Sequence, residues 1–255
     1  MPNNVSVIIV SHNRGNLLPG AIDSVLSQKF FNFELIIIDD ASTDHTAEVV
    51  EKYLTDRRVK YYKIKKGSSI AQARNAAWPH VAGKYIAVLD SDDLWSDNLK
   101  LEKQFNFLEK NLDVVLVGSG ALLIDSEGRE LSKVFKPESN SDIKKDFLIK
   151  NPFFHSSVMY RFEAIGKIGG YDEKIRFGED LDLWLRLGKI GQLHNLPEIM
   201  IKYRVHGDNE SSKHWFGAIL DVLRVIKKNR QIYGINRLVF LRKILVKLLE
   251  YFKKR

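Results

Sequence analysis

The sequence predicts an α/β fold with a mostly parallel central sheet, flanking helices and a C-terminal helical extension. Three observations lead to this prediction. Short β-branched runs alternate with segments whose apolar residues recur at helical spacing, up to about residue 96. Strands that alternate with helices pair in parallel. Two of the runs also end abruptly in aspartates, at the strand ends where open α/β sheets bind their ligands.

The first half of the chain supplies the predicted parallel strands and the helices between them. We expect strands at residues 5–10, 34–38, 59–64 and 85–89, the first of which is a β-branched run typical of a buried strand. Helices are expected at 16–28, from a Ser42 or Thr43 N-cap through residue 54, and at 68–78 with Pro79 close to the end.

The second half is less regular. Asp97 can cap a helix that runs to about Lys110, strands are expected at 114–117 and 122–124, and residues 140–150 have helical character. The segments NPFFHSSVMYR (151–161), GGYDE (169–173), FGEDLDLWLRL (177–187) and YRVHGDNES (203–211) follow. Because no repeat or flexible linker separates the halves, we expect one domain over residues 1–212 and an extension over 213–255.

Composition limits the chemistry. The 255 residues include no cysteine, which excludes disulfides, thiol catalysis and thiolate metal sites. Any metal would rest on carboxylate, imidazole and water, which favours Mg²⁺ or Mn²⁺. The N-terminal residues lack a signal-peptide pattern, and no run approaches the roughly 20 apolar residues of a membrane span. We expect a cytoplasmic protein, or one peripheral to the cytoplasmic face of the membrane.

The positive charge lies almost entirely at the C-terminus. Residues 214–255 hold eleven Lys/Arg and two Asp/Glu, a charge of +9, which leaves −1 for residues 1–213 out of the total of +8. A nucleic-acid enzyme would carry basic charge around its catalytic site, so nucleic acid is not an expected partner.

Aspartates cluster at two predicted strand ends. Asp39 and Asp40 follow one strand, and Asp90, Asp92 and Asp93 follow another. Like charges at one sheet edge favour a divalent cation that also holds phosphate oxygens. Solvated loop carboxylates that cap the next helix are the alternative for either cluster alone, but their recurrence in one sheet favours a single site.

Five segments, in order, resemble the family 2 glycosyltransferases with the GT-A fold: VSVIIVSHNR, SVLSQKFFNFELIIIDDASTD, the Ala-Arg-Asn of 73–75, LDSDD, and GED before a Leu-rich helix. The resemblance covers about residues 4–211. It implies inverting transfer of a sugar from a nucleotide-sugar donor. The processive relatives carry a Gln-x-x-Arg-Trp motif and several membrane spans, which this sequence lacks. The resemblance therefore implies addition of one sugar or a short run.

The resemblance also implies donor-binding positions. Val10, His12 and Arg14 match the contacts to base and phosphate, and Asp40 matches the carboxylate that accepts from the pyrimidine imide. A carboxylate only accepts, so it suits the imide N–H of uracil or thymine, and a UDP- or dTDP-sugar is expected. Arg74 matches an arginine that helps to hold the donor; an exposed helix salt bridge is its alternative.

The metal positions follow from the D-x-D element. Asp92 matches the direct ligand of Mn²⁺ or Mg²⁺, and Asp90 matches a residue that contacts ribose or reaches the ion through water. His206, in Tyr-Arg-Val-His, matches a histidine that closes over the diphosphate and can join the metal shell. A surface or core histidine is its alternative.

The acidic pair Glu179-Asp180 matches the acceptor-side catalytic position of the family. Inverting transfer needs a carboxylate that takes the proton of the incoming hydroxyl, and we assign Asp180 as this general base beside Glu179. Helix N-terminal acids are the alternative. We expect Asp182 and Trp184 to serve structure, and His155 is equally consistent with acceptor binding or packing.

Rival functions fit less well. A sugar-nucleotide pyrophosphorylase needs a Gly-rich loop with arginine after the first strand, where this chain has Ser-His-Asn-Arg. A phosphoacceptor receiver domain is about half this length and has its acidic pair after the first strand. A non-catalytic sugar-nucleotide binding or membrane scaffold protein stays open, although it leaves the acidic clusters unexplained.

The end of the chain has the pattern of a basic amphipathic helix. Its apolar positions are Leu238, Leu241, Leu245, Leu248, Leu249 and Phe252, and its basic positions are Arg242, Lys243, Lys247, Lys253, Lys254 and Arg255. Such a helix lies on an anionic membrane surface or packs on the domain with a solvated basic face. The first arrangement would hold the enzyme beside a glycan or lipid-linked acceptor.

Overall fold

The computed structural model describes residues 4–65, 69–147, 150–205 and 215–229. Its central sheet has the order β3-β2-β1-β4-β8-β6-β9-β5, with β7 paired to β6. The strands are β1 (Val5–Ser11), β2 (Phe33–Asp40), β3 (Val59–Ile64), β4 (Tyr85–Asp90), β5 (Leu94–Trp95), β6 (Val114–Ile124), β7 (Glu130–Val134), β8 (Met159–Arg161) and β9 (Gln192–Arg204).

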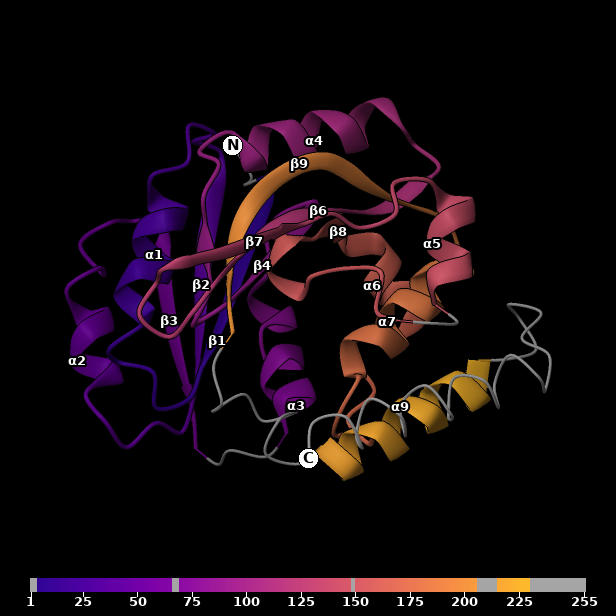
Figure 1. Cartoon of the computed structure of the whole chain (residues 1–255). Helices are drawn as coiled ribbons and strands as arrows, with labels where there is room; N and C mark the ends of the chain where they lie inside the picture. Colours follow the sequence, from indigo (N-terminus) through magenta and orange to yellow (C-terminus); the bar gives the residue numbers. More distant parts are fainter. Residues whose placement is uncertain (1–3, 66–68, 148–149, 206–214, 230–255) are drawn as a thin grey trace.

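The helices cover both faces of this sheet (Figure 1). They are α1 (Leu18–Leu26), α2 (Thr46–Glu51), α3 (Ile70–Asn75), α4 (Lys100–Lys110), α5 (Asn140–Asp146), α6 (Phe162–Ile168), α7 (Glu179–Leu187) and α9 (Trp215–Asn229), with short 3₁₀ turns at Trp78–His80 and His155–Ser157. No described helix is long and apolar enough to cross a membrane.

The predicted fold class is confirmed. Strands β1 to β4 pair in parallel. β1, β2 and β4 are largely apolar runs that are almost entirely buried, as expected for strands covered on both faces, whereas the edge strand β3 is mostly half-buried. The parallel pairing brings the carboxyl ends of β1, β2 and β4 to one edge, as expected. The antiparallel pairs lie in the second half, where β8 joins β4 to β6.

The helix starts of the first half differ from the prediction by a few residues, and α4 begins at Lys100 with Leu99, not the predicted Asp97, at the N-cap position. Helix α2 begins at Thr46 and not after Ser42 or Thr43, because the Asp44 carboxylate accepts from the Thr46 amide at 3.0 Å. The Ser42 hydroxyl instead accepts from the Asn13 amide at 2.9 Å, which ties the loop after β2 to the loop after β1. Helix α3 begins after Ser69, whose hydroxyl caps the Gln72 amide.

The two strands predicted at 114–117 and 122–124 form the single strand β6, which is a correction. Gly118 and Gly120 interrupt the apolar pattern, but the structure needs them. A Cβ at Gly118 would lie 2.3 Å from the Asn195 side chain, and one at Gly120 would lie 2.9 Å from Ile199. Both neighbours belong to β9, a long strand that the sequence did not predict. The glycines therefore allow β6 and β9 to approach closely.

Two buried apolar clusters stabilise the two faces of the sheet. Trp184 of α7 is fully buried in one of them, which confirms its structural assignment. Val225 and Ile226 of α9 are buried in the same cluster, so this helix packs on the domain against α7. The amphipathic segment predicted at 238–255 lies outside the described residues, and the boundary at residue 212 stays a prediction.

Candidate active site

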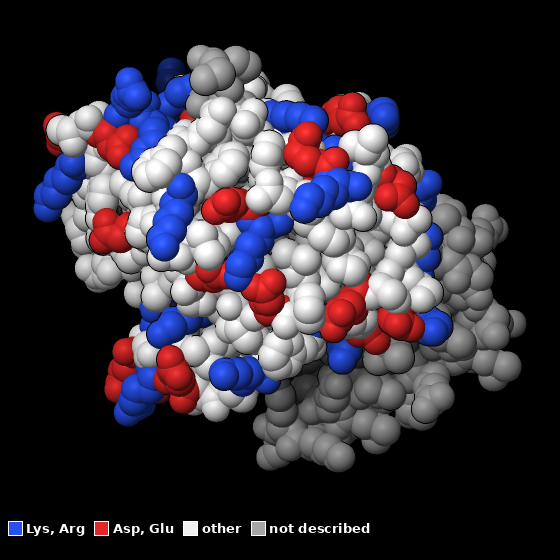
Figure 2. All heavy atoms as spheres, turned by 90° about the horizontal axis from the view of Figure 1, so that it is seen from above, with Lys and Arg blue, Asp and Glu red and all other residues white. Residues whose placement is uncertain are grey.

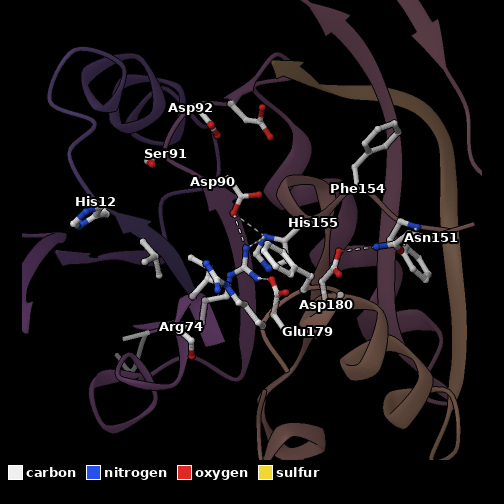
Figure 3. A pocket seen from close by; sticks show the side chains of 18 of the residues that line it. His12, Arg74, Asp90, Ser91, Asp92, Asn151, Phe154, His155, Glu179 and Asp180 are labelled. Atoms are coloured by element: carbon white, nitrogen blue, oxygen red, sulfur yellow. Dashed lines mark hydrogen bonds and ion pairs between the residues drawn. The ribbon is translucent and has the colours of Figure 1, made fainter. Parts of the chain in front are cut away.

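One pocket of about 1220 Å³ opens at the carboxyl ends of the parallel strands. It brings together nine of the ten residues predicted for the site, from β1 and β2 through α3 and β4 to α7 (Figure 3). They are Val10, His12, Arg14, Asp40, Arg74, Asp90, Asp92, Glu179 and Asp180. The tenth, His206, lies outside the described residues. Residues far apart in the sequence thus share one cavity, as the strand-end argument requires.

The β1 and β2 ends form one side of the pocket. His12 Nδ1 lies 2.6 Å from the backbone oxygen of Asp40, so the two loops are hydrogen-bonded together. The buried Asp40 Oδ1 has no hydrogen-bond partner among the described residues. Burial raises the pKa of Asp40, opposed by the charge of His12. Buried polar atoms normally have a hydrogen-bond partner, so Asp40 Oδ1 can accept from an N–H group of a ligand in the pocket.

Arg74 occupies the centre of the pocket wall and is only 7% exposed. Its guanidinium donates to Glu179 at 2.5 Å and to Asp90 at 3.0 Å. His155 Nδ1 lies 2.9 Å from the same Asp90 oxygen, and its Nε2 lies 2.9 Å from the Tyr171 hydroxyl. Arg74 therefore joins α3, β4 and α7 through buried ion pairs, a role different from the exposed salt bridge that was its alternative.

The aspartates after β4 have different surroundings. Burial opposes ionisation of Asp90, but the charges of His155 and Arg74 outweigh it and hold the pKa of Asp90 well below its usual range. Asp93 is buried, accepts from the Ser156 hydroxyl and the Arg204 amide, and its pKa is raised by burial and by Asp90 and Asp92. All three aspartates line the pocket, but Asp93 is buried and bonded within the protein, so it supports the loop.

The residues present fit a divalent cation that is shared with a ligand. No group of three or more His, Asp or Glu is arranged around a metal position in the described part of the chain. The Asp92 side chain is 22% exposed and lies 4.0 Å from Arg14. Mg²⁺ and Mn²⁺ are commonly held by one or two carboxylates together with substrate phosphates and water. Asp92 and Asp90 provide two such carboxylates.

The two acidic residues at the start of α7 have different surroundings. Glu179 is buried and bonded to Arg74. Burial raises the pKa of Glu179, the charge of Arg74 opposes this rise, and the charge of Asp180 adds to it. Asp180 accepts from the Asn151 side chain at 2.6 Å and from the Leu181 amide at 2.7 Å. Asp180 is therefore held in place by neutral donors, which suits a proton acceptor.

The structure also adds residues that the sequence did not assign. Asn151 belongs to the segment NPFFHSSVMYR and had no assigned role, whereas His155 of the same segment was left open between acceptor binding and packing. Both contact predicted site residues. Lys136 lines the pocket as well, and no local pattern marked it. Asp182 is fully buried and accepts from Arg186 at 2.6 Å, which confirms its structural role.

Comparison with known proteins gives this pocket a context. The family model for glycosyl transferase family 2 matches residues 6–169, more than half of the chain. The chain belongs to glycosyl transferase family 2. Two Bacillus subtilis relatives are 34% identical: EpsE, named as a glycosyltransferase, over 89% of this chain and 82% of its own length, and TuaG, named for teichuronic acid biosynthesis, over 84% of each.

Other relatives are longer than this family 2 chain. A glycosyltransferase of Rickettsia bellii is 36% identical over 80% of this chain, which spans only 29% of that protein. Among solved structures, TarS 1–349 of S. aureus in complex with UDP-GlcNAc has a TM-score of 0.70 at 18% identity, covering 88% of this chain and 66% of that one. The mannosyltransferase PcManGT of Pyrobaculum calidifontis, in complex with GDP-Man and Mn²⁺, has a TM-score of 0.68 at 16% identity, covering 89% and 66%. These likenesses confirm the GT-A fold.

Proposed function

We propose that this family 2 protein is an inverting glycosyltransferase of cell-surface polysaccharide synthesis. It moves a sugar from a UDP- or dTDP-sugar to a hydroxyl of a glycan or lipid-linked acceptor. The observation that carries the proposal is the single pocket in which the acidic end of β4 faces the acidic start of α7. Donor and acceptor chemistry would meet between these two groups.

The donor side of the proposal rests on Asp40. Its buried Oδ1 lacks a partner among the described residues, and a pyrimidine imide N–H would satisfy it. His12 and Arg14, from the loop after β1, line the same side of the pocket. Relatives with bound nucleotide-sugars, such as TarS with UDP-GlcNAc, support a donor of this class.

Asp92 and Asp90 would hold Mn²⁺ or Mg²⁺ against the donor diphosphate, and His206 is the third proposed contact. When bound, such an ion neutralises charge on the leaving nucleotide. Asp180 takes the proton of the acceptor hydroxyl as its oxygen attacks the anomeric carbon from the face opposite the nucleotide. Glu179, fixed by Arg74, keeps the start of α7 against β4.

A screen of nucleotide-sugars against the Asp92→Ala variant tests the donor and metal assignments. We expect the wild type to bind or hydrolyse a UDP- or dTDP-sugar only with Mn²⁺ or Mg²⁺, because the acidic strand end repels diphosphate without a cation. Calorimetry should show no metal-dependent binding by Asp92→Ala, and Asp142→Asn, at an exposed position on α5, is the control. Full-strength binding by Asp92→Ala, or by the wild type in chelator, would contradict the metal assignment.

We also propose that the protein acts at the cytoplasmic face of a membrane through its basic C-terminal segment and does not use nucleic acid. On the face shown in Figure 2, Lys and Arg side chains are interspersed with Asp and Glu, so this face has no continuous basic surface. A non-catalytic scaffold is the alternative, and product formation from any donor would exclude it.

A further inference from the structure

Lys136 is a pocket cation that no step of the proposed reaction uses. It follows β7 and lines the pocket. Its contacts are Asn151 and Phe154, which lie across the pocket from His12 (Figure 3). Its Nζ donates to the backbone oxygen of Asn151 at 2.8 Å and lies 4.4 Å from the centre of the Phe154 ring. In the described part of the chain, no Asp or Glu lies within ion-pair distance of this ammonium.

The surroundings of Lys136 disfavour its charge. Burial lowers the pKa of Lys136 to about 8. The charge of Lys150 lowers this pKa further, whereas the charges of Asp146 and Asp180 raise it. An ammonium has three N–H donors, and the Asn151 carbonyl accepts only one of them. A partly buried cation without a counter-ion is costly. A bound anion would supply both the missing charge and the missing acceptors.

Asn151 places Lys136 beside the proposed base. Its carbonyl accepts from Lys136, and its side-chain amide donates to Asp180 Oδ2 at 2.6 Å. A group that binds Lys136 therefore lies near the hydroxyl from which Asp180 takes a proton. The neighbouring cation Arg74 is already bonded to Asp90 and Glu179, so it is not free to bind the same group.

We propose that Lys136, above the Phe154 ring, binds a carboxylate or phosphate group of the acceptor, so that the enzyme selects anionic glycans. Lys174 and Arg176, from the loop before α7, line the same pocket and add positive charge to its lining. That the anion belongs to the acceptor depends on the proposed function, whereas the anion site itself depends only on the contacts of Lys136.

Paired probes that differ in one charge test the proposal. In full-length protein with saturating UDP and Mg²⁺, and again without them, NMR titration would compare trigalacturonate with its uncharged methyl ester, and glucose 6-phosphate with glucose. We expect the wild type to prefer a charged member by on the order of tenfold. Lys136→Gln should lose the preference and Lys136→Arg should keep it. Lys133→Gln, at an exposed position of β7, should behave as the wild type.

The outcomes separate the alternatives. A preference confined to the galacturonate pair identifies a carboxylate site, and one confined to the phosphate pair identifies a phosphate site. Equal binding of both members by the wild type, or equal preferences in Lys136→Gln and Lys133→Gln, overturns the proposal. A fall in UDP affinity in Lys136→Gln also overturns it, because Lys136 would then contact the donor. Failure of the wild type to bind UDP counts against the proposed function, while the titrations without UDP still decide the anion site.

Discussion

Asp180 and Glu179 are adjacent in sequence, yet their side chains have different partners. Glu179 is bonded to the buried Arg74, and Asp180 receives hydrogen bonds from the neutral Asn151 side chain and its own helix. Glu179 is buried and its carboxylate is occupied by the Arg74 guanidinium, whereas Asp180 is only half-buried and lines the pocket. This difference in access favours Asp180 as the proposed base.

We expect Asp180→Asn to bind UDP as the wild type does and to lose transfer by about 10² to 10⁴ in rate, the usual contribution of a general base. Calorimetry with UDP and a product assay in the same preparation measure the two effects. Asp142→Asn, at an exposed position of α5, serves as the matched control. A variant that lost nucleotide affinity instead would remove Asp180 from the role of base, and a product with retained anomeric configuration would contradict inversion.

Asp40 gives the donor site a pH dependence. Burial raises the pKa of Asp40, and only the ionised carboxylate is a pure acceptor for the imide N–H. UDP affinity should therefore fall as the pH is lowered through this raised pKa, and Asp40→Asn should lack that part of the dependence. Asp40→Ala should weaken UDP about tenfold to a hundredfold, as expected for loss of a hydrogen bond to a charged group. Calorimetry between pH 8 and about pH 4.5 measures both effects, and identical pH curves for wild type and Asp40→Asn would refute the assignment.

Arg74 shows how elements are joined around the pocket. It extends from α3 and bonds to Asp90 at the end of β4 and to Glu179 at the start of α7. No local sequence pattern predicts that these three elements are in contact, since residues 74 and 179 are far apart in the sequence. The buried charges hold them in one geometry.

Arg74→Met should destabilise the fold by about 3–5 kcal/mol, because it leaves two partly buried carboxylates without their cation. Urea unfolding measures this change, and Arg57→Met, at an exposed position, is the control. Adding Glu179→Gln to Arg74→Met should recover part of the loss, because one uncompensated charge is removed. Unchanged stability together with weakened donor binding would instead support the donor contact that the family resemblance implies.

The whole molecule combines the sheet with α9, which packs on the domain. Lys228 of α9 lies 2.8 Å from Asp172 and 3.2 Å from Asp182, and Val225 and Ile226 are buried. A chain that ends near residue 212 would lose this packing. A test of the basic segment must therefore retain α9.

We expect residues 1–255 to sediment with anionic liposomes at low salt and to be released at high salt, whereas a chain that ends at Asn229 stays in solution. Basic residues near such a surface contribute on the order of 1 kcal/mol each, and salt screens them. Liposomes of neutral lipid are the control. Equal sedimentation of both chains, or of neither, would make the segment a packing or oligomerisation element.

Local patterns were enough to predict the strands and most helix positions of the first half. Buried parallel strands are continuous apolar runs, so their bounds moved by only a few residues. The second half was harder to predict. β9 alternates polar and apolar residues imperfectly over Gln192–Arg204. Gly118 and Gly120 interrupt the apolar run of β6, so it was predicted as two strands. Both strands depend on their contact with each other, which is not a local property.

The sequence by itself determined the parallel strands of the first half, their acidic ends and the family, because strand character and motif order are local and can be recognised without knowledge of contacts. It also named most of the residues that line the pocket. Only the tertiary structure showed the different partners of Asp180 and Glu179, bonded Arg74 to two carboxylates, and placed Asn151 and Lys136 near the proposed base. These roles depend on partners 15 to 105 residues away, and the charge state and orientation of a side chain follow from such partners.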